Sequence, residues 1–396
     1  MNDFFVPYRT QSRTSLSRLI GRTAAACCFC LLALVSTGCS ESSLSTSSST
    51  VPLWGDYPNA RPTCVKGVHL TSWYAGSKKR RAKIETLLSE TELNTVVIDV
   101  KEVEGDVFAP GVTLNGKPNY VAAIPDLKEY LSYLKARGVF TIARITCFHD
   151  EKLTHLMPDW AIHSSTPLAL ATEHGYRKDV WVDHKGTAWA DPYNQAVGDY
   201  LIGIAERAVD AGFQGIQFDY IRFPSDGPTR LCVYSQRHTP KSAVRALVNF
   251  LHRAHDRLKP RNVELSIDVF GLTGSYDDDL GIGQKLSELL TYVDVISPMM
   301  YPSHYAPGEF GLKSPNNSPY QTVSRSVEDT MRVLGAKPVQ LRPYLQDFSL
   351  GVKYTPQKVR AQIEATMDHG VNEWILWNAA CRYTKEALEP RGQPTN

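Results

Sequence analysis

Short apolar segments alternate with longer amphipathic segments from residue 65 onward. The apolar segments are mostly rich in β-branched residues, which is typical of strands that are buried on both faces. Eight of them are predicted as strands: 65–71, 95–101, 139–147, 214–221, 262–271, 293–301, 338–345 and 372–378.

Amphipathic helical patterns lie between these strands. Residues 125–137 begin with Pro125 and end before Gly138, a start and stop that favour a helix. Further helices are predicted at 195–211, 241–259 and 356–369, which end before Gly212, Pro260 and Gly370.

The alternation of strands and helices predicts an α/β fold. Eight strand–helix units in about 320 residues indicate a (β/α)8 TIM barrel, in a domain expected over 63–390. A doubly wound sheet is the alternative, but 71–77 lacks the glycine-rich first turn that such a sheet normally carries.

One connection is much longer than the others. Between the third predicted strand and the helix at 195 lie nearly 50 residues that include three tryptophans, Trp160, Trp181 and Trp189. We expect an ordered loop insertion that forms one wall of the active site, with Trp181 or Trp189 facing a sugar; packing away from the site is the alternative. Residues 180–191 are predicted as a hairpin that turns at Lys185-Gly186.

The N-terminus resembles a bacterial export signal. Four arginines precede a 12-residue apolar run, Ala24–Val35, which is shorter than the roughly 20 residues that span a bilayer. Gly38-Cys39 resembles the lipobox of lipoproteins, although Ser36 stands where leucine is usual. We therefore expect 1–39 to be a lipoprotein signal with Cys39 lipidated, and the Ser/Pro-rich 40–62 to be a flexible tether. A cleaved secreted protein and a plain membrane anchor are the alternatives.

This N-terminus implies a lipid-anchored protein of the bacterial cell envelope. Because Ser40 rather than Asp follows the cysteine, we expect the outer membrane in a Gram-negative cell.

Charge and cysteine content exclude some functions. The net charge is +2, but residues 1–38 carry +3, so the remainder is −1 and has no basic stripe for nucleic acid. No C-x-x-C pair occurs among Cys64, Cys147, Cys232 and Cys381, and disulfides between them stay open. We expect neither a metal nor another cofactor, and the oligomeric state is not predicted.

Carboxylates follow three predicted strands, at the end where barrel enzymes place their catalytic groups. They are Asp219, Asp268 and Asp347, and we expect them to converge. Strand alternation places Gln217 and Asp219 on the inner side. Arg222 is predicted to keep Asp219 ionised as nucleophile or base, whereas Asp268 is predicted to have a raised pKa and act as general acid. The alternative is that each carboxylate is only a structural hydrogen-bond or ion-pair partner.

Further polar and aromatic side chains at the strand ends are candidates for substrate binding. For Asp99 the alternative interpretation is that it only forms an ion pair with Lys101. Aromatic rings stack on the apolar faces of sugars, although they also fill cores. The candidates are His69, Trp73, Asp99, Lys101, Arg144, His149, Trp181, Trp189, Arg222, Tyr301, His304 and Trp377.

Four stretches resemble a known family. They are 189–197, 213–227 with the string FDYIRFP, 266–271 and 296–305, and they resemble the glycoside hydrolase domain family called DUF4015 over about 65–385. The resemblance implies a TIM barrel, similar to α-amylase-like hydrolases, with the aspartate after strand 4 at Asp219. In α-amylase-like enzymes the acid on strand 5 is usually glutamate, but here it is Asp268, so Asp347 or a loop acid is a possible substitute.

Two functions remain open at this point. The first is an exported glycoside hydrolase that acts on a polysaccharide or cell-envelope glycan through paired aspartates. The second is a non-catalytic glycan-binding barrel. A glycan esterase or deacetylase is weaker, because the sequence shows no G-x-S-x-G nucleophile and no metal triad.

Overall fold

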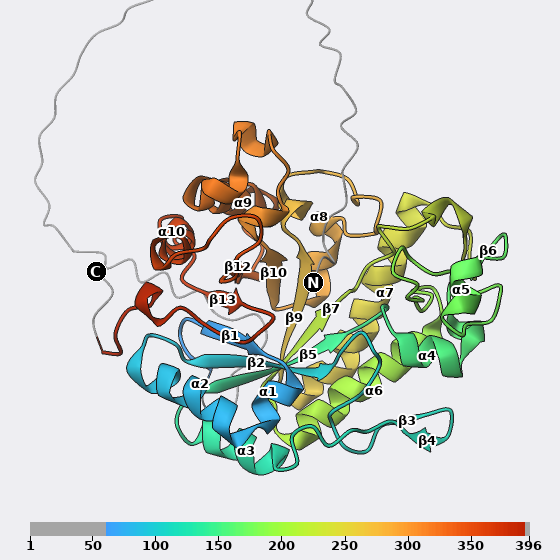
Figure 1. Ribbon diagram of the computed structural model, residues 1–396, viewed down its shortest axis with the longest axis horizontal. Helices are drawn as coiled ribbons and strands as arrows, with labels where there is room; N and C mark the ends of the chain where they lie inside the picture. Colours follow the sequence, from blue (N-terminus) through green and yellow to red (C-terminus); the bar gives the residue numbers. More distant parts are fainter. Residues whose placement is uncertain (1–60, 393–396) are drawn as a thin grey trace, which may run out of the picture. The chain divides into compact units, whose positions relative to one another are not determined.

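A closed barrel of parallel strands forms the centre of the computed structural model, which describes residues 61–392. Figure 1 shows its strands in the middle of the ribbon, surrounded by helices. The strands are β1 (Lys66–Leu70), β2 (Thr95–Lys101), β5 (Phe140–Thr146), β7 (Gly215–Asp219), β9 (Glu264–Phe270), β10 (Val295–Met299), β11 (Gln340–Leu341), β12 (Tyr344–Gln346) and β13 (Trp374–Trp377).

Pairing between the first and last strands closes the sheet. β1 pairs in parallel with both β2 and β13, and β10 pairs with β9 on one side and with β11 and β12 on the other. β11 and β12, separated by Arg342-Pro343, together take the seventh of eight positions. The predicted TIM barrel is therefore confirmed, and the doubly wound alternative is excluded.

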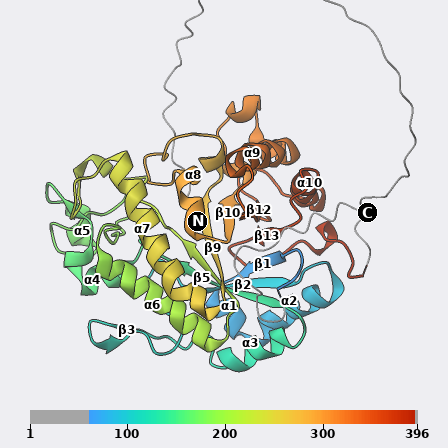
Figure 2. The same cartoon turned by 180° about the vertical axis from the view of Figure 1, so that it is seen from behind.

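Helices and short strands make up the connections. The helices are α1 (Ser72–Gly76), α2 (Lys78–Glu90), α3 (Leu127–Lys135), α4 (Glu151–Leu156), α5 (Ala169–Glu173), α6 (Gln195–Ala211), α7 (Pro240–Leu258), α8 (Leu286–Leu289), α9 (Pro319–Leu334) and α10 (Pro356–Met367). Two-residue strands pair as β3 (Thr113–Leu114) with β4 (Lys117–Pro118), and as β6 (His163–Ser164) with β8 (Cys232–Val233). Both views show α6 and α7 side by side along the barrel (Figures 1 and 2).

The predicted strands and helices agree with the structure, but two long helices were missed. α2 opens with four basic residues and buries little apolar surface, and the buried face of α9 includes the hydroxyl side chains of Thr322, Ser326 and Thr330. The sequence of α2 therefore lacks a clear apolar period, whereas α9 carries Val323, Val327 and Leu334 at helical spacing and was overlooked. Within the described residues, the connection from β9 to β10 contains only a short α-helix, the four-residue α8, beside 3-10 turns.

An ionic cluster fills the end of the barrel where the strands begin. Arg342 is fully buried and donates to Glu264, at the start of β9, at 2.7 Å and to Glu373 at 2.9 Å; Arg61 also bonds to both acids. Burial alone would raise the pKa of Glu264, but Arg342 and Arg61 lower it to about 2. This end is therefore closed by paired charges, and the strand ends opposite are left for function.

The predicted export signal, Cys39 and most of the predicted tether lie outside the described residues. Within residues 61–392, no helix is both long enough and apolar enough to cross a membrane.

Candidate active site

Arg144 gathers three carboxylates from three neighbouring strands. From β5, its Nη1 donates to Oδ1 of Asp99 on β2 at 2.6 Å, and its Nε donates to Oδ2 of Asp219 on β7 at 3.1 Å. Nη2 also bonds to Asp219, and Nε lies 3.7 Å from Oδ2 of Asp268 on β9. The cluster therefore lies near the carboxyl ends of four consecutive barrel strands.

Strand register explains why these side chains meet. Asp99 pairs with Arg144 across β2 and β5, and Thr146 pairs with Asp219 across β5 and β7. The inner side of β7 carries Gln217, which donates to Ser297 and accepts from Tyr344 inside the barrel. Phe218 points outward and packs on Phe250 of α7 at 5.1 Å. The predicted inward position of Asp219 is thus confirmed.

The side chains of this cluster shift one another's pKa values. Burial alone would lower the pKa of Arg144, but the three carboxylates raise it well above its usual range. Burial alone would raise the pKa of Asp99, but His69 and Arg144 lower it. Burial and the negative charge of Asp219 raise the pKa of Asp268 well above its usual range, against the effect of Arg144. These shifts favour the charged form of Asp99 and the protonated form of Asp268.

The shared contact with Arg144 sets an upper limit on the separation of Asp219 and Asp268. Because both Oδ2 atoms lie within 3.7 Å of Nε of Arg144, they are at most about 6.8 Å apart. Retaining glycosidases use about 5–5.5 Å and inverting ones about 6.5–9.5 Å. Asp268 is only 1% exposed, and its Oδ1 has no hydrogen-bond partner among the described residues.

Arg222 was wrongly predicted as the partner of Asp219. Tyr220 has a φ of +51°, so the chain turns out of the strand before Arg222. The buried guanidinium of Arg222 lies over the rings of Trp189, Tyr220 and Phe270 and donates to the backbone oxygen of Phe223. Arg144, predicted only as a substrate-binding residue, takes the place beside Asp219.

Asp347 and Lys101 also lie apart from the Arg144 cluster. Asp347 accepts hydrogen bonds from the backbone nitrogen and the hydroxyl of Thr384, both at 2.7 Å, and thereby anchors the C-terminal segment. Lys101 is fully buried, and its Nζ lies 2.9 Å from Asp150 rather than beside Asp99. The predicted convergence of three strand-end aspartates is therefore correct for two of them.

Trp181 and Trp189 are core residues, which corrects the prediction that one of them faces a sugar. Trp181 is fully buried and donates from Nε1 to the backbone oxygen of Pro228. Trp189 is 1% exposed and stacks on His149 at 4.5 Å, and Tyr220 packs against both rings. Burial lowers the pKa of His149 to about 3, so this ring is neutral. The predicted hairpin is present, with Val182 paired to Ala188.

Aromatic side chains from four strand ends do come together. Trp377 lies 5.7 Å from Tyr301, 5.2 Å from Phe348 and 6.2 Å from His69, measured between ring centroids. His304 contacts Tyr301 and Phe348. His69 connects this group to the carboxylates, because its Nε2 lies 2.9 Å from Oδ2 of Asp99. Trp73 stands apart as an exposed ring, 55% accessible, against Phe108.

Glu102 is a titratable side chain that the sequence did not single out as a candidate. It follows β2 directly, and burial and the negative charge of Asp99 raise its pKa to about 8. The signal available in the sequence was the close spacing of Asp99, Glu102 and Glu104 at one strand end.

A family model described as "Putative glycosyl hydrolase domain" (DUF4015) matches residues 67–383. The chain belongs to this family. A comparison with curated proteins finds no significant match.

Solved structures are similar to this glycosyl hydrolase domain. The glycoside hydrolase domain of PgaB (BpsB) from Bordetella bronchiseptica is 13% identical, covers 82% of this chain and 99% of its own, and superposes with a TM-score of 0.58. A hypothetical protein from Ruminiclostridium thermocellum is 30% identical over 51% of this chain and 97% of its own, with a TM-score of 0.41. The likeness to the PgaB domain shows a shared fold.

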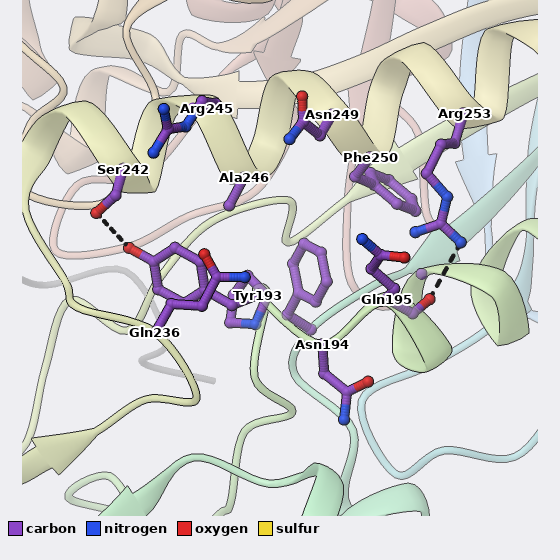
Figure 3. A pocket seen from close by; sticks show the side chains of 13 residues that line it. Tyr193, Asn194, Gln195, Gln236, Ser242, Arg245, Ala246, Asn249, Phe250 and Arg253 are labelled. Atoms are coloured by element: carbon purple, nitrogen blue, oxygen red, sulfur yellow. Dashed lines mark hydrogen bonds between the residues drawn. The ribbon is translucent and has the colours of Figure 1, made fainter.

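A surface pocket of the glycosyl hydrolase domain lies away from these carboxylates. Figure 3 shows it between the start of α6 and the side of α7, where Tyr193 bonds to Ser242 and Arg253 donates to the backbone of Gln195. None of the strand-end carboxylates lines it.

No group of three metal-binding side chains comes together between residues 61 and 392. Cys64, Cys147, Cys232 and Cys381 are all free thiols there.

Proposed function

We propose that this protein is an exported, membrane-tethered glycoside hydrolase that cleaves O-glycosidic bonds of a polysaccharide or cell-envelope glycan. The observation that carries this proposal is the pair of carboxyl groups on Asp219 and Asp268, which share Arg144, while burial and the charge of Asp219 raise the pKa of Asp268. Glycosidic hydrolysis needs one ionised and one protonated carboxyl group, set apart by their environments.

In this proposal Asp219 is the nucleophile or the base. Oδ2 of Asp219 accepts hydrogen bonds from the guanidinium of Arg144, and the backbone nitrogen of Tyr220 donates to its Oδ1 at 2.5 Å. Such a carboxylate can attack an anomeric carbon or remove a proton from water.

In this proposal Asp268 is the general acid, because its raised pKa favours the protonated form that this role requires. Support comes from its raised pKa and from its position beside Asp219. Because Asp268 is almost completely buried, a proton from its carboxyl reaches a substrate only after neighbouring side chains move.

The substrate is proposed to lie over the aromatic group of Trp377, Tyr301 and Phe348. These rings lie at or just beyond the ends of β10, β12 and β13, and sugar rings stack on such faces. We further propose that the insertion at 148–194 borders the site, because His149 and Trp189 pack against Tyr220, the residue after Asp219.

Export and tethering are proposed from the sequence of residues 1–62. The support is the basic and apolar N-terminus, Gly38-Cys39 and the serine-rich run that follows. A lipid on Cys39 would hold the barrel at the cell envelope.

A non-catalytic glycan-binding barrel is the second candidate, and the burial of Asp268 favours it. A panel of polysaccharides and envelope glycans, assayed for both reducing-end release and binding, separates the two. Release of reducing ends supports the hydrolase, whereas binding to a glycan without release on any member supports the binding module.

A further inference from the structure

Arg222 is a buried cation without an ion pair. It is only 4% exposed, and no carboxylate among residues 61–392 forms a salt bridge with it. Its Nη1 donates to two neutral oxygens, the backbone oxygen of Phe223 at 3.2 Å and the hydroxyl of Ser225 at 3.1 Å. Contacts with three aromatic rings offset only part of the cost of burying a charge. An anionic group on a ligand would supply the missing partner.

The unused edge of this guanidinium suits a carboxylate. Nε and Nη2 of Arg222 make no hydrogen bond among the described residues, and neither belongs to the fully buried polar atoms that lack a partner there. This edge therefore keeps some accessible surface. The N–H groups on Nε and Nη2 are parallel, so together they can donate to both oxygens of one carboxylate.

Arg222 lies next to the proposed catalytic carboxylates. Its Cζ is 4.9 Å from the ring centroid of Tyr220, the residue after Asp219. The same atom is 4.9 Å from the ring centroid of Phe270, which ends β9 two residues after Asp268 and is partly exposed. A glycan with its scissile bond between the two aspartates would therefore place an adjoining sugar beside Arg222.

A second basic surface begins beside Asp99. The hydroxyl of Ser72 donates to the backbone oxygen of Asp99, and the next residue, Trp73, is an exposed ring. α2 follows with a basic run of four exposed side chains that form no salt bridge among the described residues: Lys78, Lys79, Arg80 and Lys83. Cations in the first turn of a helix destabilise it, so helix stability does not explain this run. Such a local concentration of positive charge attracts an anionic polymer.

We propose that the substrate is an acidic glycan, in which a sugar carboxylate binds the Nε–Nη2 edge of Arg222 and further acidic sugars extend across Trp73 to the basic run. This inference rests on the proposed hydrolase function and names the substrate class of its site. A carboxylate pairs with the buried charge of Arg222, whereas a neutral sugar leaves that charge unpaired.

The test measures binding of polygalacturonate, polyglucuronate and alginate, each beside its carboxyl-reduced form. Reduction keeps the linkages and removes the charges. Wild-type protein should bind at least one polyuronate about 10- to 100-fold more tightly than its neutral form, as expected for hydrogen bonds to a charged group. Arg222→Met fills the same space over the rings without a charge and should abolish this preference. Arg222→Lys keeps the charge but not the parallel donors and should retain only part of it.

The melting temperature separates substrate binding from a structural role. Because Arg222→Met removes no ion pair, its melting temperature should stay near that of the wild type. A fall in melting temperature with an unchanged preference for acidic glycans would make Arg222 structural.

The basic run provides a test on the surface, with little effect on the core. The double variant Lys79→Gln with Arg80→Gln should weaken polyuronate binding by about 3- to 10-fold at low salt and leave the neutral forms unaffected. The matched control is Lys135→Gln with Arg137→Gln, which removes the same two exposed charges where α3 leads into the start of β5. This control should bind like the wild type.

Three results would overturn the inference. They are equal affinity of the wild type for all acidic and neutral forms, a preference that folded Arg222→Met retains, and binding of inorganic polyphosphate as tight as that of any polyuronate. Reducing-end release on the same panel tests the hydrolase separately. Cleavage without a preference for acidic glycans refutes this inference alone, whereas acid-selective binding without cleavage on any member refutes the hydrolase and keeps the role of Arg222 in binding.

Discussion

The Nε of Arg144 donates a hydrogen bond to Oδ2 of Asp219 across 3.1 Å, although the two residues are 75 positions apart in the chain. β5 and β7 are neighbours in the barrel, and their register places both side chains on the inner face. The charge on Asp219 is thus balanced by a residue on another strand, and the same guanidinium binds Asp99.

The two acids beside Arg144 should respond differently to loss of charge. Asp99 is ionised in the fold, so Asp99→Asn removes a buried charge that compensates Arg144 and should cost about 3 kcal/mol of unfolding free energy. Burial and the charge of Asp219 raise the pKa of Asp268 and favour its neutral form, so Asp268→Asn should change the unfolding free energy by less than about 1 kcal/mol. Denaturant unfolding at pH 7 measures both, and equal losses would contradict the assigned protonation states.

The ionic cluster at the opposite end of the barrel should control stability and not turnover. Glu264→Gln leaves buried Arg342 with one fewer charged partner and should cost about 3–5 kcal/mol, with kcat unchanged at temperatures where the variant is folded. Since the pKa of Glu264 is lowered to about 2, its stabilising contribution is full above its ordinary value and is lost as the pH falls toward 2. Wild-type and variant stabilities should therefore converge in acid, and a gap that widens there would contradict this account.

Substitution of a buried tryptophan should lower stability, whereas substitution of an exposed one should weaken glycan binding. Trp181→Ala empties a fully buried site and should cost about 3–5 kcal/mol, seen as a large fall in melting temperature. Trp73→Ala removes an exposed ring near the end of β1 and should leave the melting temperature near wild type while it weakens glycan binding. An unchanged melting temperature for Trp181→Ala would contradict its assignment to the core and would support a role in glycan binding.

The proposed tether has its own test. Cys39→Ala should release the protein from the membrane fraction, because it removes the residue proposed to carry the lipid. Ser36→Ala is a matched control within the same segment and should stay with membranes. If Cys39→Ala still sediments with membranes after a high-salt wash, the lipobox interpretation is wrong.

The strands could be predicted from sequence because each is buried on both faces, so its apolar run is nearly continuous. Asp219 and Asp268 were found for the related reason that a carboxylate stands out at the end of such a run. The ion pairs could not be predicted, because they depend on register between strands distant in the chain. Arg222 was favoured by its nearness in sequence to Asp219, but the turn at Tyr220 directs it elsewhere.

The roles of the aromatic residues could not be predicted from the sequence. Trp181, Trp189 and Trp377 look alike in sequence, since each lies among apolar residues at or beyond a predicted strand. Only packing distinguishes the two that fill the core of 148–194 from the one that contacts Tyr301 near the carboxylates. Glu102 was overlooked because its chemistry depends on the charge of Asp99, and the charge of Asp99 is fixed by Arg144.

The central claim is that Asp219 carries out glycosidic hydrolysis, and reducing-end release by purified wild type and Asp219→Asn measures it most directly. Both proteins are assayed on one glycan that the wild type cleaves, with melting temperature and glycan binding as controls for folding. The account predicts a loss of kcat on the order of 10³-fold or more with binding retained. Near-wild-type release by Asp219→Asn would contradict it.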